Sequence, residues 1–193
     1  MSAKRNQAIL AHQVQILGAC PLVVFDVETT GLSAAKGERV IEIGAVRVVA
    51  GQFVERFSSL VATSRPIAPG AQVVHGISAA MLEGQPEAGE VFSSFRSFIG
   101  EDLLVAHNAH FDIGFLEAEF ARMEQRLGNS YYCTLKLSRL NYPHLRSHKL
   151  EILGRYLFGE LPGVRHHRAL DDAELAARVL LQILRDNGGT GSV

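Results

Sequence analysis

The segment VVFDVETTGL, at residues 23–32, ends an apolar run with two acidic residues, Asp26 and Glu28. The apolar run indicates a buried strand, and side chains in a strand alternate between its two faces. Asp26 and Glu28 are therefore expected on the same face. Two carboxylates so close together repel each other and raise each other's pKa, so the pair is expected to need a positive partner.

Two further aspartates, Asp112 and Asp172, stand where helices are expected to begin. Asp112 ends the segment HNAHFD after a short buried strand, and an aspartate there is by itself typical of a helix N-cap. Asp172 shares a helical face with the apolar Ala176 and Val179, so its side chain is expected to face inward. An inward carboxylate without a partner is costly. The outward Asp171 better fits the ordinary role of a first-turn acid, which is compensation of the helix dipole.

Four inward carboxylates at the ends of strands and helices need a shared cation. Carboxylate oxygens suit Mg²⁺ or Mn²⁺, and two such ions about 4 Å apart are a common device for in-line displacement at phosphorus. Zinc is not expected, because cysteine ligands at the usual spacing are missing. The residue types therefore predict a site for divalent metal ions made of Asp26, Glu28, Asp112 and Asp172.

The rest of the chain predicts the elements that hold these residues. After the first strand, further strands are expected at 39–50, 52–61, 103–106 and about 131–134. Residues 65–70 are expected to form a loop. Helical spacing predicts helices at 4–17, at 87–99, from Asp112 towards Leu127, from about Ser147, and at 169–186. Three consecutive strands, followed by strands that alternate with helices, indicate an α/β fold with a mixed central sheet of about five strands flanked by helices.

Length and composition bound the domain organisation. The 193 residues fit one domain, and no apolar run approaches the length of a membrane span. We expect an N-terminal helical extension at 1–19, a main domain at 20–186 and a flexible tail at 187–193. Cys20 and Cys133 lie far apart in no metal-binding spacing. They are expected to be buried small apolar residues in a protein of the reducing cytoplasm.

Charge is distributed unevenly along the chain. The net charge is −1, yet residues 136–168 hold seven Lys or Arg and only two acids. A basic segment of this kind is consistent with a nucleic-acid partner, and also with an ordinary solvated surface. The basic residues are Lys136, Arg139, Arg146, Lys149, Arg155, Arg165 and Arg168.

The segments FDVETTGL, HNAHFD and HRALDDA occur in this order and resemble the three motifs of the DEDDh 3′–5′ exonucleases. This family includes the proofreading epsilon subunit of bacterial DNA polymerase III and ribonuclease T. The resemblance covers roughly residues 20–185 and implies a ribonuclease H-like fold. It also implies that the domain at 20–186 is an exonuclease domain, which hydrolyses single-stranded DNA 3′ ends to nucleoside 5′-monophosphates.

The resemblance assigns roles at the centre of the site. It implies that His167 is the general base. A tyrosine branch of the family has Tyr at the position of Arg168, so the histidine branch fits this sequence. The four acids are implied as ligands of two divalent ions, Mg²⁺ or Mn²⁺, and they are Asp26, Glu28, Asp112 and Asp172.

The spacing between the histidine and the last aspartate occurs twice in this chain. His166 and Asp171 have the same separation as His167 and Asp172. The family pattern also places an alanine two residues after the histidine and another directly after the aspartate. Both alanines are present only for the pair of His167 and Asp172, which is therefore the predicted frame.

The resemblance also assigns residues to the substrate, single-stranded nucleic acid with a free 3′ end. Thr29, Thr30 and Leu32 match positions that hold the terminal nucleotide, partly through main-chain amides. His75 matches a histidine that lies against that nucleotide. Phe111 matches a base-stacking residue, although ordinary core packing is almost as good an interpretation of this side chain.

Two other functions remain open. The substrate could be RNA, as for ribonuclease T, or the domain could bind nucleic acid without catalysis; the five filled catalytic positions count against the second alternative. The epsilon subunit carries a tail for binding the polymerase after its exonuclease domain, whereas this chain stops soon after its last helix. A free-standing repair-type enzyme, or an excised domain, is therefore expected rather than a polymerase-bound subunit. The N-terminal helix lies outside the resemblance and is expected either to pack on its own domain or to mediate dimerisation.

Overall fold

The computed structural model describes residues 3–159 and 167–188, with side chains from Leu10 onwards. Within these ranges, five strands form one mixed sheet in the order β3-β2-β1-β4-β5. The β1–β2 and β2–β3 pairs are antiparallel, and the β1–β4 and β4–β5 pairs are parallel. The strands are β1 (Leu22–Thr29), β2 (Val40–Val49), β3 (Gln52–Leu60), β4 (Leu103–Ala106) and β5 (Tyr131–Cys133). The predicted mixed sheet is therefore confirmed.

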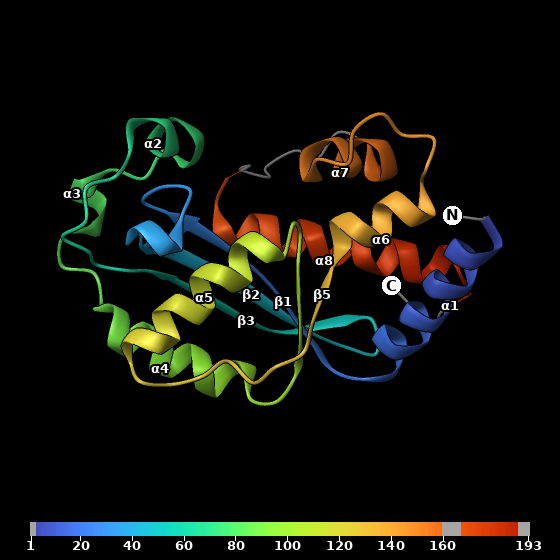
Figure 1. Cartoon of the computed structure of the whole chain (residues 1–193), viewed down its shortest axis with the longest axis horizontal. Helices are drawn as coiled ribbons and strands as arrows, with labels where there is room; N and C mark the ends of the chain where they lie inside the picture. The colour runs from blue at the N-terminus through green and yellow to red at the C-terminus, as the bar shows by residue number, and fades with distance from the viewer. Residues whose placement is uncertain (1–2, 160–166, 189–193) are drawn as a thin grey trace.

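Helices cover both faces of this sheet. Figure 1 shows α4 and α5 towards one end of the view, and α1, α6 and α7 around α8 towards the other. The bounds are α1 (Ala3–Ala19), α4 (Ala88–Ile99), α5 (His110–Arg122), α6 (Thr134–Asn141), α7 (Leu150–Phe158) and α8 (Ala169–Asp186). None of the described helices combines the length and the apolar character that crossing a membrane requires. The layers agree with the predicted α/β class.

The alternation of β1 explains how a core strand can carry acidic residues. Phe25 faces the core that α4 and α5 share with the sheet. Leu22 and Val24 point to the opposite face, into the core beneath α8. Asp26 and Glu28 continue this second row towards the end of the strand, where α8 begins. The sheet therefore presents both carboxylates on one face, as predicted.

The N-terminal helix α1 belongs to the same core as α8. Leu10, Val14 and Leu17 are buried in that cluster, and α1 contacts α6 and α8. Of the two expectations for this helix, packing on its own domain is the one that the structure shows. The predicted tail begins with Asn187 and Gly188, whose backbone amides still donate to carbonyls of the last turn of α8. The remainder of the tail lies outside the described residues.

The sequence pattern does not predict three short helices of the described chain, which are α2 (Pro69–His75), α3 (Ala79–Leu82) and α6. Helices this short show too few turns for a clear period. The predicted loop ends at Pro69, which opens α2, because proline fits the first helical turn. α5 ends at Arg122, so Leu127 lies beyond the helix although it still packs against the core. The helix expected from Ser147 begins at Leu150.

The prediction that both cysteines are buried is wrong for Cys20. This residue is exposed directly after α1, where the chain turns towards β1. Cys133 is partly buried at the end of β5. Connecting residues lie on the surface of a domain whatever their hydrophobicity, and composition does not reveal which residues connect.

Candidate active site

Asp26 and Glu28 lie near the carboxyl end of β1, on the face that α8 covers. Burial raises the pKa of Asp26 well above its ordinary value, and the charges of Asp112 and Asp172 raise it further. Burial likewise raises the pKa of Glu28 to about 8, followed by the charges of Asp172 and Glu42. The carboxylates are thus close enough to disfavour one another's ionised form.

Asp112 reaches the same place from the first turn of α5. Its side chain is buried, and its Oδ1 accepts a hydrogen bond from the backbone N–H of Val27 at 3.3 Å. Burial raises the pKa of Asp112 to about 7, and hydrogen bonds from its own and the Val27 amides oppose part of this shift. The N-cap position of α5 is Ala109, so the interpretation of Asp112 as an ordinary N-cap is wrong. Its carboxylate instead joins the helix to β1.

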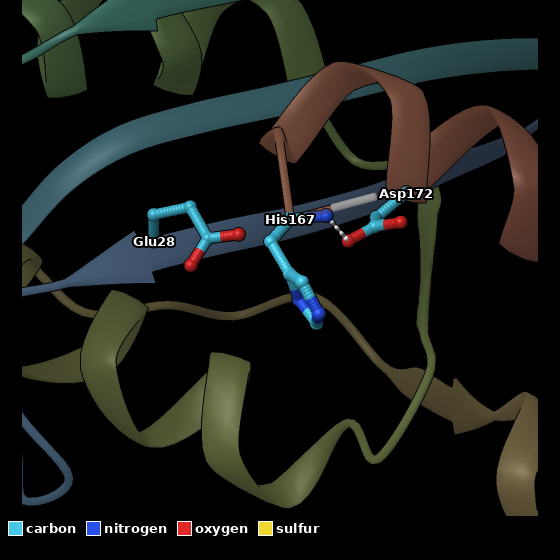
Figure 2. Close-up of side chains that lie close together, drawn as sticks. All are labelled: Glu28, His167 and Asp172. Atoms are coloured by element: carbon cyan, nitrogen blue, oxygen red, sulfur yellow. Dashed lines mark hydrogen bonds between the residues drawn. The ribbon is translucent and has the colours of Figure 1, made fainter. Parts of the chain in front are cut away.

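Asp172 and His167 come from the start of α8. The Oδ2 atom of the buried Asp172 accepts a hydrogen bond from the backbone N–H of His167 at 2.9 Å. His167 has a φ of 65°, in the left-handed region that few non-glycine residues adopt. One ring nitrogen of His167 and one carboxylate oxygen each from Glu28 and Asp172 lie within 4.8 Å of one another. Figure 2 shows the imidazole lying beside both acids.

The donor set fits a divalent metal ion. Carboxylate oxygens are the ligands that Mg²⁺ and Mn²⁺ prefer, and an imidazole nitrogen beside them is compatible with Mn²⁺. The raised pKa values indicate that the protein's own cations do not offset the negative charge of the ionised cluster. The residues that would hold the metal are Asp26, Glu28, Asp112 and Asp172.

Two residues of β2, Glu42 and Gly44, support the site, although the motifs do not include them. They pair in register with the two acids of β1. A Cβ at Gly44 would lie 2.1 Å from the backbone nitrogen of Leu170, so only glycine lets the start of α8 approach the strand this closely. The buried Glu42 accepts a hydrogen bond from the Arg168 side chain at 2.6 Å. The only sequence signal for this pair is a glutamate and a glycine inside the apolar run VIEIGAVRVV.

An apolar cavity of about 510 Å³ lies beside Glu28. Leu32, at its edge, is 87% exposed, which is unusual for so large an apolar side chain. The ring of Phe111 lines the cavity and also packs against Phe115 at a centroid distance of 5.0 Å, so its stacking and packing interpretations both stay open. The lining residues are Glu28, Thr29, Gly31, Leu32, Ala68, Gly70, Ala71, Val74, His75 and Phe111.

Thr30 is the one predicted substrate-binding residue that does not line this cavity. Its side chain is fully buried, and its hydroxyl donates to Glu38 Oε2 at 2.6 Å and accepts from the backbone N–H of Arg39 at 2.9 Å. Its own amide donates to the Arg39 carbonyl. The polar groups of Thr30 are thus used inside the protein. These contacts support the turn that carries Leu32, and the predicted role of Thr30 towards the substrate stays a prediction.

His75 lines the apolar cavity and has one buried ring nitrogen without a normal hydrogen bond among the described residues. Its Nδ1 accepts a hydrogen bond from the backbone N–H of Ile77 at 3.0 Å, so the proton of the neutral ring is on Nε2. Burial lowers the pKa of His75, and the Thr29 backbone opposes part of this shift. Nε2 is buried and forms no hydrogen bond of normal geometry with the described residues.

A second cavity, of about 700 Å³, lies on the side of His167 and Asp172 and has a basic wall. Of the predicted basic segment, Arg168 does not line it and pairs with Glu42, and Arg165 lies outside the described residues. The lining residues are His107, Asn108, Leu135, Arg139, Arg146, Ser147, His148, Lys149, Leu150, Glu151, His167 and Asp172.

His107 bonds to residues on both sides of it and so stabilises one wall of this basic cavity. Its Nδ1 lies 2.9 Å from Thr134 Oγ1, and its Nε2 lies 2.9 Å from the carbonyl oxygen of His148. Burial lowers the pKa of His107 to about 4, so the ring is neutral near pH 7. The ring thus connects the end of β4 to the segment that carries Arg146 and Lys149.

Known proteins are similar to this chain in sequence. A family model described as Exonuclease, of the ribonuclease T type, matches residues 23–180. A DNA polymerase III PolC-type from Bacillus subtilis (strain 168) is 39% identical over 171 residues, which are 88% of this chain and 12% of that protein. The protein of the same name from Halalkalibacterium halodurans is 43% identical over 167 residues, 85% of this chain and 11% of that protein. This chain therefore spans only a small part of the length of these polymerases.

Solved structures share the fold. Exonuclease X in complex with 5′-overhanging duplex DNA superimposes with a TM-score of 0.71 and 32% identity, covering 88% of this chain and 95% of that chain. E. coli Exonuclease I in complex with a dA16 oligonucleotide has a TM-score of 0.77 at 17% identity, covering 88% of this chain and 41% of that one, which supports the fold alone. The expected ribonuclease H-like fold is thus confirmed. The chain belongs to the exonuclease family that its three motifs indicate, the DEDDh-type 3′–5′ exonucleases.

Proposed function

We propose that this protein is a metal-dependent 3′–5′ exonuclease that hydrolyses single-stranded DNA 3′ ends to nucleoside 5′-monophosphates. The observation that carries the proposal is the position of Glu28, His167 and Asp172, with ligand atoms within 4.8 Å, between an apolar and a basic cavity. The apolar cavity suits the terminal nucleoside, whose base can stack on Phe111. The basic cavity suits the phosphates that precede it. The scissile phosphodiester then lies against the carboxylates.

Two divalent ions, Mg²⁺ or Mn²⁺, are proposed at the carboxylates. When bound, they supply Lewis-acid charge at the scissile phosphate and lower the pKa of a bound water. The raised pKa values of the acids in the metal-free protein support this proposal, because they indicate negative charge in need of a partner. The proposed ligands are Asp26, Glu28, Asp112 and Asp172.

His167 is the proposed general base. Its side chain is exposed, so the ring can exchange protons with solvent, while Asp172 fixes its backbone N–H. A neutral imidazole nitrogen can accept a proton from an attacking water. His75 takes a different part, because it lines the apolar cavity that is proposed to hold the terminal nucleoside.

DNA is the favoured substrate. Exonuclease X was solved with DNA and is similar over almost its whole length, and the PolC-type relatives are DNA polymerases. Trimming of 3′ ends in DNA replication or repair fits this substrate. The chemistry described above uses residues of this chain alone, so it requires no polymerase partner.

Single-stranded DNA and RNA oligonucleotides of the same sequence, labelled at either end, test the proposal. With Mg²⁺ or Mn²⁺ we expect stepwise shortening of 5′-labelled DNA and direct release of a mononucleotide from 3′-labelled DNA. The Asp112→Asn variant is the matched inactive control. Preferential digestion of RNA would favour a ribonuclease T-type substrate, and binding without hydrolysis would identify a non-catalytic module. Undiminished activity in excess chelator would exclude a metal-dependent reaction.

A further inference from the structure

The start of α8 is fastened to β2 by a single buried carboxylate, that of Glu42. Its Oε1 accepts hydrogen bonds from Arg168 Nε at 3.0 Å and from Arg168 Nη2 at 2.6 Å. Its Oε2 accepts the backbone N–H of Ala169 at 3.1 Å. The Glu42 side chain is 4% exposed. A planar guanidinium held at two nitrogens has little freedom to turn, so this contact fixes direction as well as distance.

Arg168 stands between the proposed base and the helix. His167 precedes it with a left-handed backbone, which strains a residue that has a side chain. The turn is held on both sides: Asp172 accepts the N–H of His167, and Glu42 holds both the Arg168 side chain and the next N–H. Relaxation of His167 towards an ordinary backbone conformation would have to break one of these contacts. The orientation of the imidazole is therefore coupled to the ion pair.

A second ion pair of the same construction shows what such a contact does elsewhere in the chain. Arg39 donates to the buried Glu119 through Nε at 2.8 Å and Nη2 at 2.9 Å, and Glu119 also accepts the backbone N–H of Val40 at 3.2 Å. This pair joins β2 to α5, and the Arg39 side chain bonds Glu119 rather than His167 or a proposed metal ligand. Arg39 also holds Thr30, but through backbone groups that a change of side chain leaves in place. Glu119 has a second cation, because Arg122 lies 3.2 Å from it. Arg39 is therefore a control for the loss of a buried guanidinium contact away from His167.

We propose that Glu42 and Arg168 are positioning residues for the exonuclease reaction, which hold the turn that places His167 against Glu28 and Asp172. This inference rests on the proposed function, because the turn matters for catalysis only if His167 acts on the substrate. The pair also balances its own charge. Without Arg168, a glutamate opposite Glu28 would add an uncompensated negative charge beside the cluster.

The test compares Arg168→Met with Arg39→Met, because methionine keeps much of the length of the arginine stem and removes its charge. We expect Arg168→Met to lower kcat on a single-stranded DNA oligonucleotide by about 10-fold to 100-fold with KM changed by less than about 3-fold, the pattern of a misplaced reacting group. Arg39→Met should lower Tm by no more than Arg168→Met does, because Arg122 still pairs with Glu119, and should leave kcat near that of the wild type. Arg168→Lys should recover only part of kcat, because an ammonium cannot make the bidentate contact.

Hydrogen exchange of the metal-free proteins supplies a readout independent of activity. The amides of His167 and Ala169 should exchange faster in Arg168→Met and at the wild-type rate in Arg39→Met. If single Met variants do not fold, the double variant Glu42→Gln/Arg168→Met removes the unpaired buried charge and carries the same expectations. Equal kcat losses in the two Met variants, or unchanged exchange at His167, would overturn the inference. An inactive wild type would refute the proposed function instead, and the exchange data would still decide whether the pair holds the turn.

Discussion

The two helices that bring aspartates to the site, α5 and α8, hold them in different ways. Asp112 of α5 is 2% exposed and accepts a hydrogen bond from Val27 in the neighbouring strand. Asp172 of α8 is bonded to His167, five residues earlier in its own segment. Asp112 is thus fastened to the sheet directly, whereas Asp172 is fastened to a turn that itself needs support. One half of the site is set by the core, and the other by contacts around that turn.

The two helix starts also face different cavities. Phe111, at the start of α5, lines the apolar cavity, and His167 and Asp172 line the basic one. If the proposed function holds, the α5 half of the site contacts the terminal nucleoside and the α8 half contacts the phosphates and the attacking water. Substitutions in the two halves should therefore differ in how they change kcat, KM and the salt dependence of KM.

The largest loss of kcat is expected at the two aspartates, because the α5 half and the α8 half of the site each supply one proposed metal ligand. Asp112→Asn and Asp172→Asn should each lower kcat by at least about 10³-fold, because each removes a charged ligand from the metal site. In chelator at pH 8, Asp112→Asn should raise Tm more than Asp172→Asn does, because it removes the more deeply buried charge. Oligonucleotide digestion and thermal unfolding measure the two quantities. Near wild-type activity in either variant would contradict a site of four carboxylates.

The next largest effect should be confined to the α8 half. His167→Ala is expected to lower kcat by about 10²-fold, the usual scale for loss of a general base. His166→Ala and Asp171→Ala are the controls for the alternative frame and should be mild. Asp171 lies beside Glu174 and Arg178, away from the carboxylate cluster. A collapse of activity in His166→Ala together with an active His167→Ala would show that the other frame is correct.

Substitutions at two glycines allow the packing of α8 and of α5 to be compared. Gly44→Ala should destabilise the protein by about 1–3 kcal/mol, because its Cβ would lie 2.1 Å from the Leu170 nitrogen and would displace the start of α8. A Cβ at Gly114 of α5 would meet no heavy atom within 4 Å. Gly114→Ala is therefore expected to be neutral or to stabilise by up to about 1 kcal/mol through helix propensity. Denaturant unfolding of both variants checks the contrast, and equal stability changes would contradict it.

Variants of the two cavities should differ in how their KM depends on salt concentration. Combined Arg146→Ala and Lys149→Ala should raise KM several-fold and flatten its salt dependence, because phosphate contacts release counterions. Phe111→Ala should also raise KM but leave the salt dependence unchanged, since stacking involves no counterion release. Steady-state kinetics at several salt concentrations measures both slopes. An unchanged slope in the double variant would leave the basic wall as ordinary surface.

The smallest expected effect is a dependence of stability on pH. The pKa of Glu28 is raised to about 8 and that of Asp112 to about 7, so protonation of these acids favours the metal-free folded state. Their stabilising contribution is complete below about pH 4 and is lost as pH rises through 7 and 8. Mn²⁺ requires the ionised acids, so its gain in Tm should grow over the same range. Thermal unfolding with chelator or Mn²⁺ at about pH 5.5 and 8.5 tests both signs, and a larger Mn²⁺ gain at the lower pH would contradict them.

The parts of this protein that could be predicted from sequence are those with a local period or motif. The strand at 103–106 and the helix at 169–186 agree with the structure to the residue, because a short apolar run and a long amphipathic pattern define them. The inward side of Asp172 follows from the same helical period. The ion pair of Glu42 with Arg168 could not be predicted, because its partners are 126 residues apart and meet only through the fold. The internal contacts of Thr30 could not be predicted either, since a motif position does not reveal which neighbour its hydroxyl bonds.

The side chains of β1 alternate between two cores, and this determines what happens if the strand pairs out of register. The acids belong to the row of Leu22 and Val24, and the other row, with Phe25, fills the phenylalanine-rich core. A slip of one residue in the pairing of β1 would turn Asp26 and Glu28 into that core and expose large apolar side chains to the α8 side. The misaligned chain would lose its stability and its metal ligands in the same event. A misregistered form is therefore expected to be both unstable and inactive.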